Sequence, residues 1–277
     1  EDMAKGLAGA LKIVINSVYG LTSAKFDNPF TDRPNNANNI VALRGALMMR
    51  TLQDEVEARG FKVVHIKTDS IKIADATPEI IEFVREFGKK YGYNFETEDT
   101  FDRICLVNDA VYIAKDKEGQ WHATGAQFAV PYVFKKCFSK EPIEFKDMCE
   151  IKEVQTAMFL DFGEGKDLRF VGKVGSFTPI KLNCGGGLLV KEQLKKDGSI
   201  GMDAVTGTKG YQWLESSDVS SNLLMDSIDK SYYEELVNKA VETINKYGDY
   251  EWFVSDDPYQ GPVYINGRPD YSIGCPF

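Results

Sequence analysis

Three consecutive polar residues, Thr68, Asp69 and Ser70, lie between two short runs rich in valine and isoleucine, 61–66 and 71–74. Two such runs around a short polar segment predict a β-hairpin with the Asp69 carboxylate at its tip. An acidic side chain on a rigid turn suits a divalent metal ion, because its oxygens are held in place before the ion arrives. The same residue types are common turn formers that bond their own backbone, so both interpretations stay open on this segment alone.

A second polar set, Lys12, Asn16 and Tyr19, lies about 50 residues upstream at spacings of four and three. At about 100° per residue these side chains share one face of a helix. A lysine suits a phosphate, an asparagine offers donors and an acceptor, and a tyrosine offers a flat ring with a hydroxyl group. This face could hold a nucleoside triphosphate. The alternative is a solvated helix face with a tyrosine packed at its end.

Helical periodicity predicts the elements that would position these residues. Helices are expected over 4–19 and 38–58, from Thr77 and Pro78 onward, and over 231–247. The first two end at Gly20 and Gly60, and Ser231 with Glu234 would form a capping box for the last. The apolar faces consist of Leu7, Leu11, Val14, Ile15 and Val18 in the first helix, Ile40, Val41, Leu43, Leu47, Met48, Leu52 and Val56 in the second, and Ile80, Val84, Phe87 and Tyr91 in the third.

The extended and irregular segments are harder to assign. A strand is expected over 93–98, and 103–115 and 120–128 are expected to pair as a hairpin around the turn DKEG. Pro131 is a plausible boundary, with a short helix in PYVFKKCF after it. The rest of the chain divides into 144–160, which fits either helix or strand, 162–215, expected to hold short strands between glycine-rich loops, and 255–277, expected to wrap a surface.

The composition is that of an ordinary folded protein, since 43% of the 277 residues are hydrophobic and 27% are charged. No run of 18 apolar residues occurs, so no membrane partner is expected. The chain begins with Glu inside a predicted helix and without a signal peptide, so it is expected to be a piece of a longer protein. Five scattered cysteines without a CxxC pair, and only two histidines, argue against a zinc site and indicate free thiols in a reducing cytoplasm.

The net charge of −9 argues against general nucleic-acid binding, but the charges are unevenly distributed. Residues 1–74 carry 10 Lys and Arg against 8 Asp and Glu, whereas residues 214–277 carry 4 against 12. Any contact with DNA is therefore expected in the earlier parts of the chain.

The segment KIVINSVYG, at 12–20, matches the K-x-x-x-N-S-x-Y-G motif on the fingers helix of family B DNA polymerases. The order helix, loop, helix and T-D-S hairpin is also that family's order from this motif to its palm hairpin. Later segments, among them VYIAK, GQWHATGAQF, PYVFKK and TGTKGYQWLES, resemble phage members. The chain therefore resembles a phage or prophage polymerase of family B over nearly its whole length, with its motifs in the first half.

This resemblance implies a role for each motif residue. Lys12 would contact the triphosphate of the incoming deoxynucleotide, Asn16 would help to position it, and Tyr19 would lie near the nascent base pair. Asp69 would bind the two catalytic Mg²⁺ ions. These ions would lower the pKa of the primer 3′-hydroxyl and stabilise the departing pyrophosphate, so no nucleophilic side chain is needed.

Contacts with primer–template DNA are implied for Thr68, Ser70 and Tyr112, but two departures from the family pattern bear on them. The family usually reads D-T-D-S, and Lys67 replaces the first Asp, as either a phosphate contact or a solvated turn residue. Two basic residues often precede the tyrosine of the primer-lining strand. Here Asp109-Ala110-Val111 precedes Tyr112, and Lys115 is the nearest substitute.

A third departure concerns catalysis. The family's other metal-binding Asp lies in an upstream D-x-x-S-L-Y-P segment, which this sequence lacks. One Asp cannot organise a two-metal site alone, so the isolated chain is expected to be nearly or wholly inactive without the upstream polymerase portion, which would also hold the exonuclease.

Other candidate residues have ordinary structural explanations beside the functional ones. Lys135, Lys136 and Lys140, with Phe134 and Phe138, could follow a DNA backbone or form a helix with one solvated face. The Cys-Gly-Gly-Gly run at 184–187 could approach a phosphate backbone, although a flexible turn is favoured. His65 is expected to be packed rather than catalytic, and Trp213 and Trp252 to be core residues.

The sequence thus predicts an α+β fold: a helical fingers remnant and a palm-leading helix over 1–60, a palm with the T-D-S hairpin over 61–130, and a loop-rich α+β thumb over 131–277. The function expected from the resemblance is template-directed DNA synthesis with Mg²⁺ in a bacterial host's cytoplasm. A polymerase remnant that grips primer–template DNA without catalysis is the main alternative. A cytosolic domain with no nucleic-acid role, its motifs coincidental, is a third.

Overall fold

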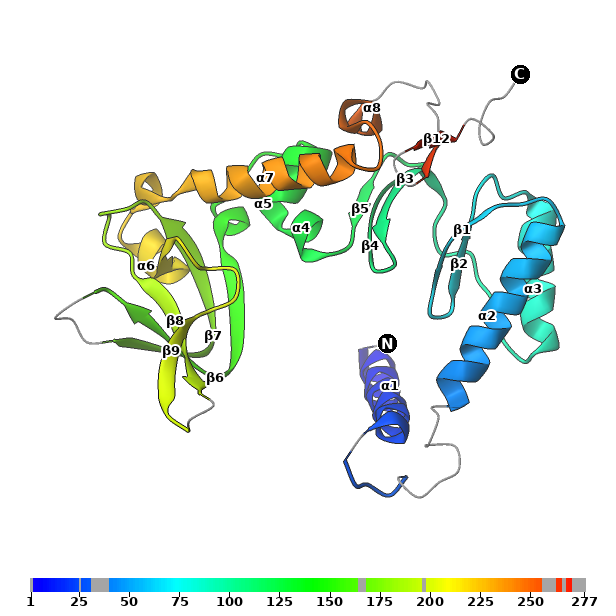
Figure 1. Cartoon of the computed structure of the whole chain (residues 1–277), viewed down its shortest axis with the longest axis horizontal. Helices are drawn as coiled ribbons and strands as arrows, with labels where there is room; N and C mark the ends of the chain where they lie inside the picture. Colours follow the sequence, from blue (N-terminus) through cyan, green and yellow to red (C-terminus); the bar gives the residue numbers. More distant parts are fainter. Residues whose placement is uncertain are drawn as a thin grey trace. The chain divides into compact units, whose positions relative to one another are not determined.

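The computed structural model describes residues 2–24, 26–30, 40–163, 168–195, 198–255, 263–265 and 268–270. The chain divides into two compact units, Glu1–Glu98 (unit 1) and Asp99–Phe277 (unit 2). Helices and antiparallel strands occur in both (Figure 1), which confirms the α+β class. The finer division into 1–60, 61–130 and 131–277 stays a prediction. None of the described helices is long and apolar enough to cross a membrane.

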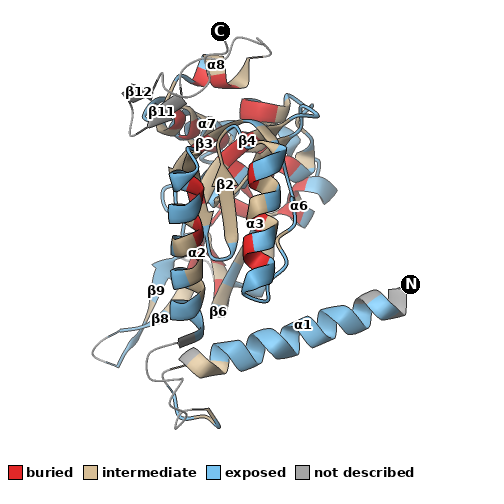
Figure 2. Cartoon of the chain, turned by 90° about the vertical axis from the view of Figure 1, so that its right-hand side faces the viewer, coloured by how far each residue is buried: buried red, intermediate tan, exposed pale blue. Residues whose placement is uncertain are grey.

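The first helix of unit 1, α1 (Asp2–Ser23), is longer than predicted. Gly20 lies inside it, and the hydroxyl of Thr22 donates to the carbonyl of Tyr19 at 2.6 Å in the last turn. A glycine therefore does not end this helix. Every described residue from Ala4 to Gly20 is exposed, including the whole apolar face (Figure 2).

The core of unit 1 lies between α2 (Ile40–Ala58), α3 (Pro78–Lys90) and the hairpin β1–β2. Its buried side chains are Met49, Leu52, Val56, Ile80, Val84 and Phe87. The prediction that Val41, Leu43 and Leu47 face inward is wrong, since all three are more than half exposed. The described core includes no α2 residue before Met48, so only the second half of α2 is packed.

The predicted helix boundaries around the hairpin are confirmed. Gly60 adopts a φ of +85°, and its N–H donates to the carbonyl of Glu57 at 2.9 Å, which ends α2. Thr77 is the N-cap residue of α3, with Pro78 as the first helical residue, whereas Tyr91 lies just beyond the helix and is exposed.

The predicted strand over 93–98 is absent. The Tyr93 N–H instead donates to the carbonyl of Gly88 at 2.9 Å, turning the chain back on α3. The Phe95 ring then fills the space above Gly88, where an added Cβ would lie 2.5 Å from the ring. Packing of one aromatic side chain therefore overrides the extended pattern.

Unit 2 begins with a three-stranded antiparallel sheet of β3 (Phe101–Asn108), β4 (Val111–Asp116) and β5 (Trp121–Ala123). The hairpin predicted around DKEG is confirmed, with Lys115 on β4 opposite Trp121 on β5, but the predicted continuous strand 103–115 is wrong. It is broken after Asn108, whose side-chain oxygen accepts from the N–H groups of Ala110 at 2.9 Å and Val111 at 3.0 Å. The prediction for 120–128 fails beyond Ala123, because α4 begins at Ala126.

Helices cover one face of this sheet: α4 (Ala126–Ala129), α5 (Pro131–Phe134), a π-helical turn (Lys135–Ser139), α7 (Lys230–Asn245) and α8 (Tyr250–Val254). The short helix expected after Pro131 is confirmed. The buried residues shared by sheet and helices are Cys105, Ile113, Phe128, Val133, Cys137, Phe138, Ala240, Ile244, Tyr250 and Phe253.

A five-stranded antiparallel sheet, in the order β10-β7-β6-β8-β9, forms the rest of unit 2. Its strands are β6 (Glu150–Asp161), β7 (Arg169–Ile180), β8 (Leu188–Leu194), β9 (Ile200–Ala204) and β10 (Gln212–Glu215). The 144–160 segment is thus a 3-10 turn (Phe145–Met148) followed by a strand, and the strands expected in 162–215 are confirmed. This sheet packs against α6 (Ser216–Ser221) and α7, with Trp213 fully buried as predicted.

Of two predictions near the C-terminus, one is wrong and the other lies mostly outside the described residues. The N-cap of α7 is Asp229, whose carboxylate accepts from the Ser231 N–H at 3.1 Å, so the proposed capping box of Ser231 and Glu234 is wrong. A second 3-10 turn (Met225–Ser227) precedes it. Of 255–277, only Ser255 and the pair β11 (Val263–Ile265) and β12 (Arg268–Asp270) are described, so the expected wrapping lies mostly outside the described residues.

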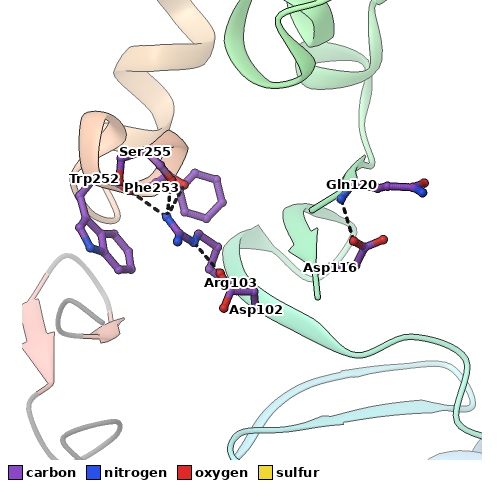
Figure 3. A network of polar contacts seen from close by, with 7 residues as sticks. All are labelled: Asp102, Arg103, Asp116, Gln120, Trp252, Phe253 and Ser255. Carbon is purple, nitrogen blue, oxygen red and sulfur yellow. Dashed lines mark hydrogen bonds and ion pairs between the residues drawn. The ribbon is translucent and has the colours of Figure 1, made fainter. Parts of the chain in front are cut away.

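Arg103 fastens α8 to strand β3 (Figure 3). Its Nη1 donates to the carbonyls of Trp252 at 3.1 Å, Phe253 at 3.3 Å and Ser255 at 3.0 Å. Its Nε donates to Asp102 at 3.0 Å. The guanidinium therefore donates to carbonyls at the end of α8, of which that of Trp252 also accepts from the N–H of Ser255 at 3.2 Å.

Replacing Arg103 with alanine is expected to lower the free energy of unfolding of unit 2 by about 2 kcal/mol, because carbonyls at the end of a helix lose a charged donor. Urea unfolding followed by circular dichroism measures this. The matched control is Arg169→Ala, whose ion pairs with Glu215 and Asp218 lie at the surface and whose loss should cost less than about 1 kcal/mol. Equal effects of the two substitutions would contradict the role given to Arg103.

Candidate functional site

The predicted hairpin is present and its tip is short. Strands β1 (Val63–Lys67) and β2 (Ser70–Ile73) are antiparallel, with Lys67 opposite Ser70. Thr68 and Asp69 are therefore the two turn residues, and both are exposed.

Ser70, rather than Asp69, supplies the local turn bond. The Ser70 hydroxyl donates to the carbonyl of Lys67 at 3.0 Å. Asp69 has no hydrogen bond or ion pair among the described residues. The Asp69 side chain therefore takes no part in the turn's hydrogen bonds, and its carboxylate is available to a ligand.

Thr68 has a φ of +55°, which is unfavourable for a β-branched residue. Thr68→Asn is expected to raise the free energy of unfolding of unit 1 by about 0.5 to 1 kcal/mol, since asparagine adopts this region more easily. Thermal unfolding measures the change. Asp75, at φ +48°, is the control, because Asp75→Asn exchanges two residues that both tolerate this conformation. A lower stability of the Thr68 variant would count against backbone strain at the tip.

A groove with a volume of about 650 Å³ lies beside the tip within unit 1. Thr68, Asp69 and Ile66 contribute from the hairpin and Tyr19 from α1. The α2 side of the groove is lined by Val41, Ala42, Gly45, Ala46, Met49, Arg50 and Gln53. The groove thus combines a largely apolar wall, which includes the small residues Ala42, Gly45 and Ala46, with a few polar groups.

The groove brings together only part of the predicted site. Tyr19, Thr68 and Asp69 line it, whereas Lys12 and Asn16 do not. Lys12 and Asn16 are both exposed on α1. Lys67, which lies on β1 next to the hairpin tip, is also exposed. Their predicted contacts with the triphosphate stay predictions.

Sequence reasoning missed Arg50 and Gln53, which line the groove from α2. The available signal was spacing: Ala42, Ala46, Arg50 and Gln53 recur at intervals of four, four and three and so share one helix face. The prediction for α2 was based on its large apolar residues and therefore did not include this face.

Asp69 fits a Mg²⁺ site as one ligand. Mg²⁺ is usually bound through one or two carboxylates, with substrate phosphates and water completing an octahedron. Within the described ranges, no group of three or more His, Cys, Asp or Glu side chains could hold a metal ion. Among the described residues that line the groove, Asp69 is the one carboxylate that could bind such an ion.

Tyr112 and Lys115 lie on β4 of unit 2. The N–H of Tyr112 donates to Thr124 Oγ1 at 2.9 Å, and its ring centroid lies 6.3 Å from that of Phe101. The Lys115 ammonium group lies 5.6 Å from the centre of the Trp121 ring. Both side chains thus have structural contacts, and the DNA contact of Tyr112 stays a prediction.

The alternative basic cluster is largely structural. Lys135 Nζ donates to Asp147 at 2.8 Å, with side chains that are only 13% and 3% exposed. Phe138 is buried in the core, so this segment does not present an aromatic, basic surface. Of the three lysines, Lys136 and Lys140 remain exposed.

The remaining candidates also have structural contacts, and the approach of the 184–187 run to a phosphate backbone stays a prediction. The glycines at 186 and 187 pack tightly, since an added Cβ would lie 2.9 Å from Gln212 Cβ and 2.9 Å from the Asp161 carbonyl oxygen, respectively. His65 is buried as expected, and Trp252 packs against the core beside Arg103. The four described cysteines, Cys105, Cys137, Cys149 and Cys184, form no disulfide, and burial raises the pKa of the Cys105 thiol to about 11.

Comparison of the sequence with protein-family models gives no match, and neither does comparison with curated proteins.

Proposed function

We propose that the chain is the C-terminal fingers, palm and thumb portion of a family B DNA-directed DNA polymerase of phage or prophage type. In the whole enzyme it would add deoxynucleotides to a primer 3′ end by two-metal phosphoryl transfer in the cytoplasm of a bacterial host. Its partners would be primer–template DNA, deoxynucleoside triphosphates and the upstream polymerase portion that holds the second metal-binding Asp.

The observation that carries this proposal is the Asp69 carboxylate, which has no partner among the residues that the structure describes. A two-residue turn holds it at the edge of the groove, and Ser70 makes the local turn bond in its place. Such a carboxylate can bind a metal ion without first breaking a contact with any described residue, so the main cost is the removal of water.

Each residue then has a defined task. Mg²⁺ supplies Lewis-acid chemistry when bound, and Asp69 holds and orients it at the tip. Tyr19 lies along the same groove, where its ring suits a base. Lys12 and Asn16, exposed on the same helix, would reach the triphosphate.

Primer extension with Mg²⁺ and all four nucleotides tests the proposal. The 277-residue chain should bind primer–template DNA in low salt without extending it, because it lacks the D-x-x-S-L-Y-P segment. The chain extended upstream through that segment should extend the primer. Failure of the 277-residue chain to bind DNA in low salt would instead favour a domain without a nucleic-acid role.

A DNA-gripping remnant without catalysis is the second candidate, because an exposed lysine, Lys67, stands where the family has its first Asp. In that case the upstream-extended chain binds primer–template DNA with no extension.

A further inference from the structure

Arg50 is held at the wall of the groove by its neighbours on α2. Its Nε lies 3.1 Å from a carboxylate oxygen of Asp54, and its Nη1 donates to the side-chain oxygen of Gln53 at 3.3 Å. The amide of Gln53 in turn donates to Glu57 at 2.8 Å. Two neighbours thus restrict a long side chain that is otherwise 66% exposed.

Among the described residues that line the groove, Arg50 is the single cation and Asp69 the single anion. A ligand that bridges them needs a negative group for the guanidinium and a metal-binding group for the carboxylate. Phosphate groups do both, since arginine binds phosphate oxygens with paired N–H donors and Mg²⁺ prefers phosphate oxygens.

The surface between these two charges suits a sugar and a base. Ala42, Gly45 and Ala46 leave room because their side chains are small, and Tyr19 offers a ring for stacking. An acidic peptide would use Arg50 but would leave this apolar and aromatic wall without a matching group.

We propose that Arg50 binds a backbone phosphate of a nucleic-acid strand that lies in the groove, and that Asp54 and Gln53 pre-orient its guanidinium for this contact. The inference rests on the proposed function and adds to it a residue outside both recognised motifs. Arg50 acts as a binding residue, whereas Asp69 holds the metal.

Fluorescence anisotropy with a labelled primer–template and Mg²⁺, repeated over a range of salt concentrations, tests this with the 277-residue chain. Arg50→Ala is expected to weaken binding about tenfold and to lower the salt slope by about one phosphate contact. Arg50→Lys should keep the salt slope but recover only part of the affinity, because lysine lacks the planar fork.

Arg44→Ala is the matched control, since Arg44 is an exposed arginine of the same helix that does not line the groove. It removes the same charge and should leave affinity and salt slope within about twofold of the unaltered chain. Circular dichroism of each variant verifies that it folds.

The outcomes separate this inference from the proposed function. Equal losses for Arg50→Ala and Arg44→Ala would overturn the role of Arg50 while leaving DNA binding in place. Binding of an acidic peptide in preference to DNA, abolished by Arg50→Ala, would overturn the choice of ligand. Absence of DNA binding by the unaltered chain would overturn the proposed function and this inference together.

Discussion

Asp69→Asn is expected to reduce Mg²⁺-dependent primer extension by the upstream-extended chain on the order of 1,000-fold. The carboxylate lies at the tip of a two-residue turn and has no competing contact among the described residues. Asparagine keeps the size and shape of the side chain but loses the negative charge that binds Mg²⁺. The loss should therefore appear in the rate of extension while the fold is unchanged.

Asp75→Asn is the matched control for this experiment. Asp75 is also exposed, follows β2 a few residues later, and does not line the groove. It should retain extension, and both variants should retain binding of primer–template DNA. Full activity of the Asp69 variant would remove its role as metal ligand, whereas equal loss in both variants would indicate a general effect of charge.

The second large effect is expected on stability. Lys135→Ala should lower the free energy of unfolding of unit 2 by about 3 to 5 kcal/mol, because it leaves the buried Asp147 carboxylate without its cation. Lys135 Nζ also donates to the carbonyl of Pro142 at 3.2 Å, so a second, exposed contact is lost. Lys136→Ala removes an exposed neighbour and should change stability by less than about 0.5 kcal/mol.

Two further measurements verify that the charge of Asp147 causes this loss. Adding Asp147→Asn to Lys135→Met removes the stranded charge, so this double variant should be more stable than Lys135→Met alone. Burial by itself raises the pKa of Asp147, but hydrogen bonds from Lys135 and from the Glu144 N–H outweigh it and hold the pKa below 3.8. A depressed pKa in the folded state stabilises the protein above about pH 4, and this contribution is lost as the pH falls through the folded pKa.

In the Lys135 variant, burial still raises the pKa of Asp147, and only the Glu144 N–H and the charge of Lys146 still lower it. Urea unfolding between about pH 5 and about pH 3 should therefore show a smaller acid-induced loss in the variant than in the unaltered protein. An unchanged pH dependence would assign the acid sensitivity of unit 2 to other carboxylates.

The parts of the fold that follow from local chemistry were predictable from the sequence. The hairpin around Asp69 and the end of α2 at Gly60 depend on residues within a few positions of each other. The start of α3 at Pro78 likewise depends on residues next to it in the sequence. Periodicity and turn chemistry are sufficient for such features.

The errors arose where distant or competing contacts decide. Phe95 packs over Gly88 and prevents a strand, and the Asn108 side chain breaks a run that otherwise reads as continuous. The cap of α7 shifts to Asp229 because a carboxylate is available just before Ser231.

The candidate site divides in the same way. The hairpin tip was recognisable because its residues are adjacent in the sequence. Arg50 was not, since its importance depends on a groove formed by α1, α2 and the hairpin together. Lys135 could not be recognised as part of a buried ion pair, because its partner Asp147 lies 12 residues later in the sequence, after a turn.

The exposure of α1 from Ala4 to Gly20 has a thermodynamic consequence for nucleotide binding. A helix that buries so little of its surface depends mainly on its backbone bonds and propensities, and isolated helices are only marginally stable in water. Gly6, Gly9 and Gly20 weaken this one further. A triphosphate that engages Lys12 and Asn16 would therefore shift a helix–coil equilibrium as it binds. The measured affinity would then contain the ordering of α1 together with the contacts themselves, with a large unfavourable entropy as its signature.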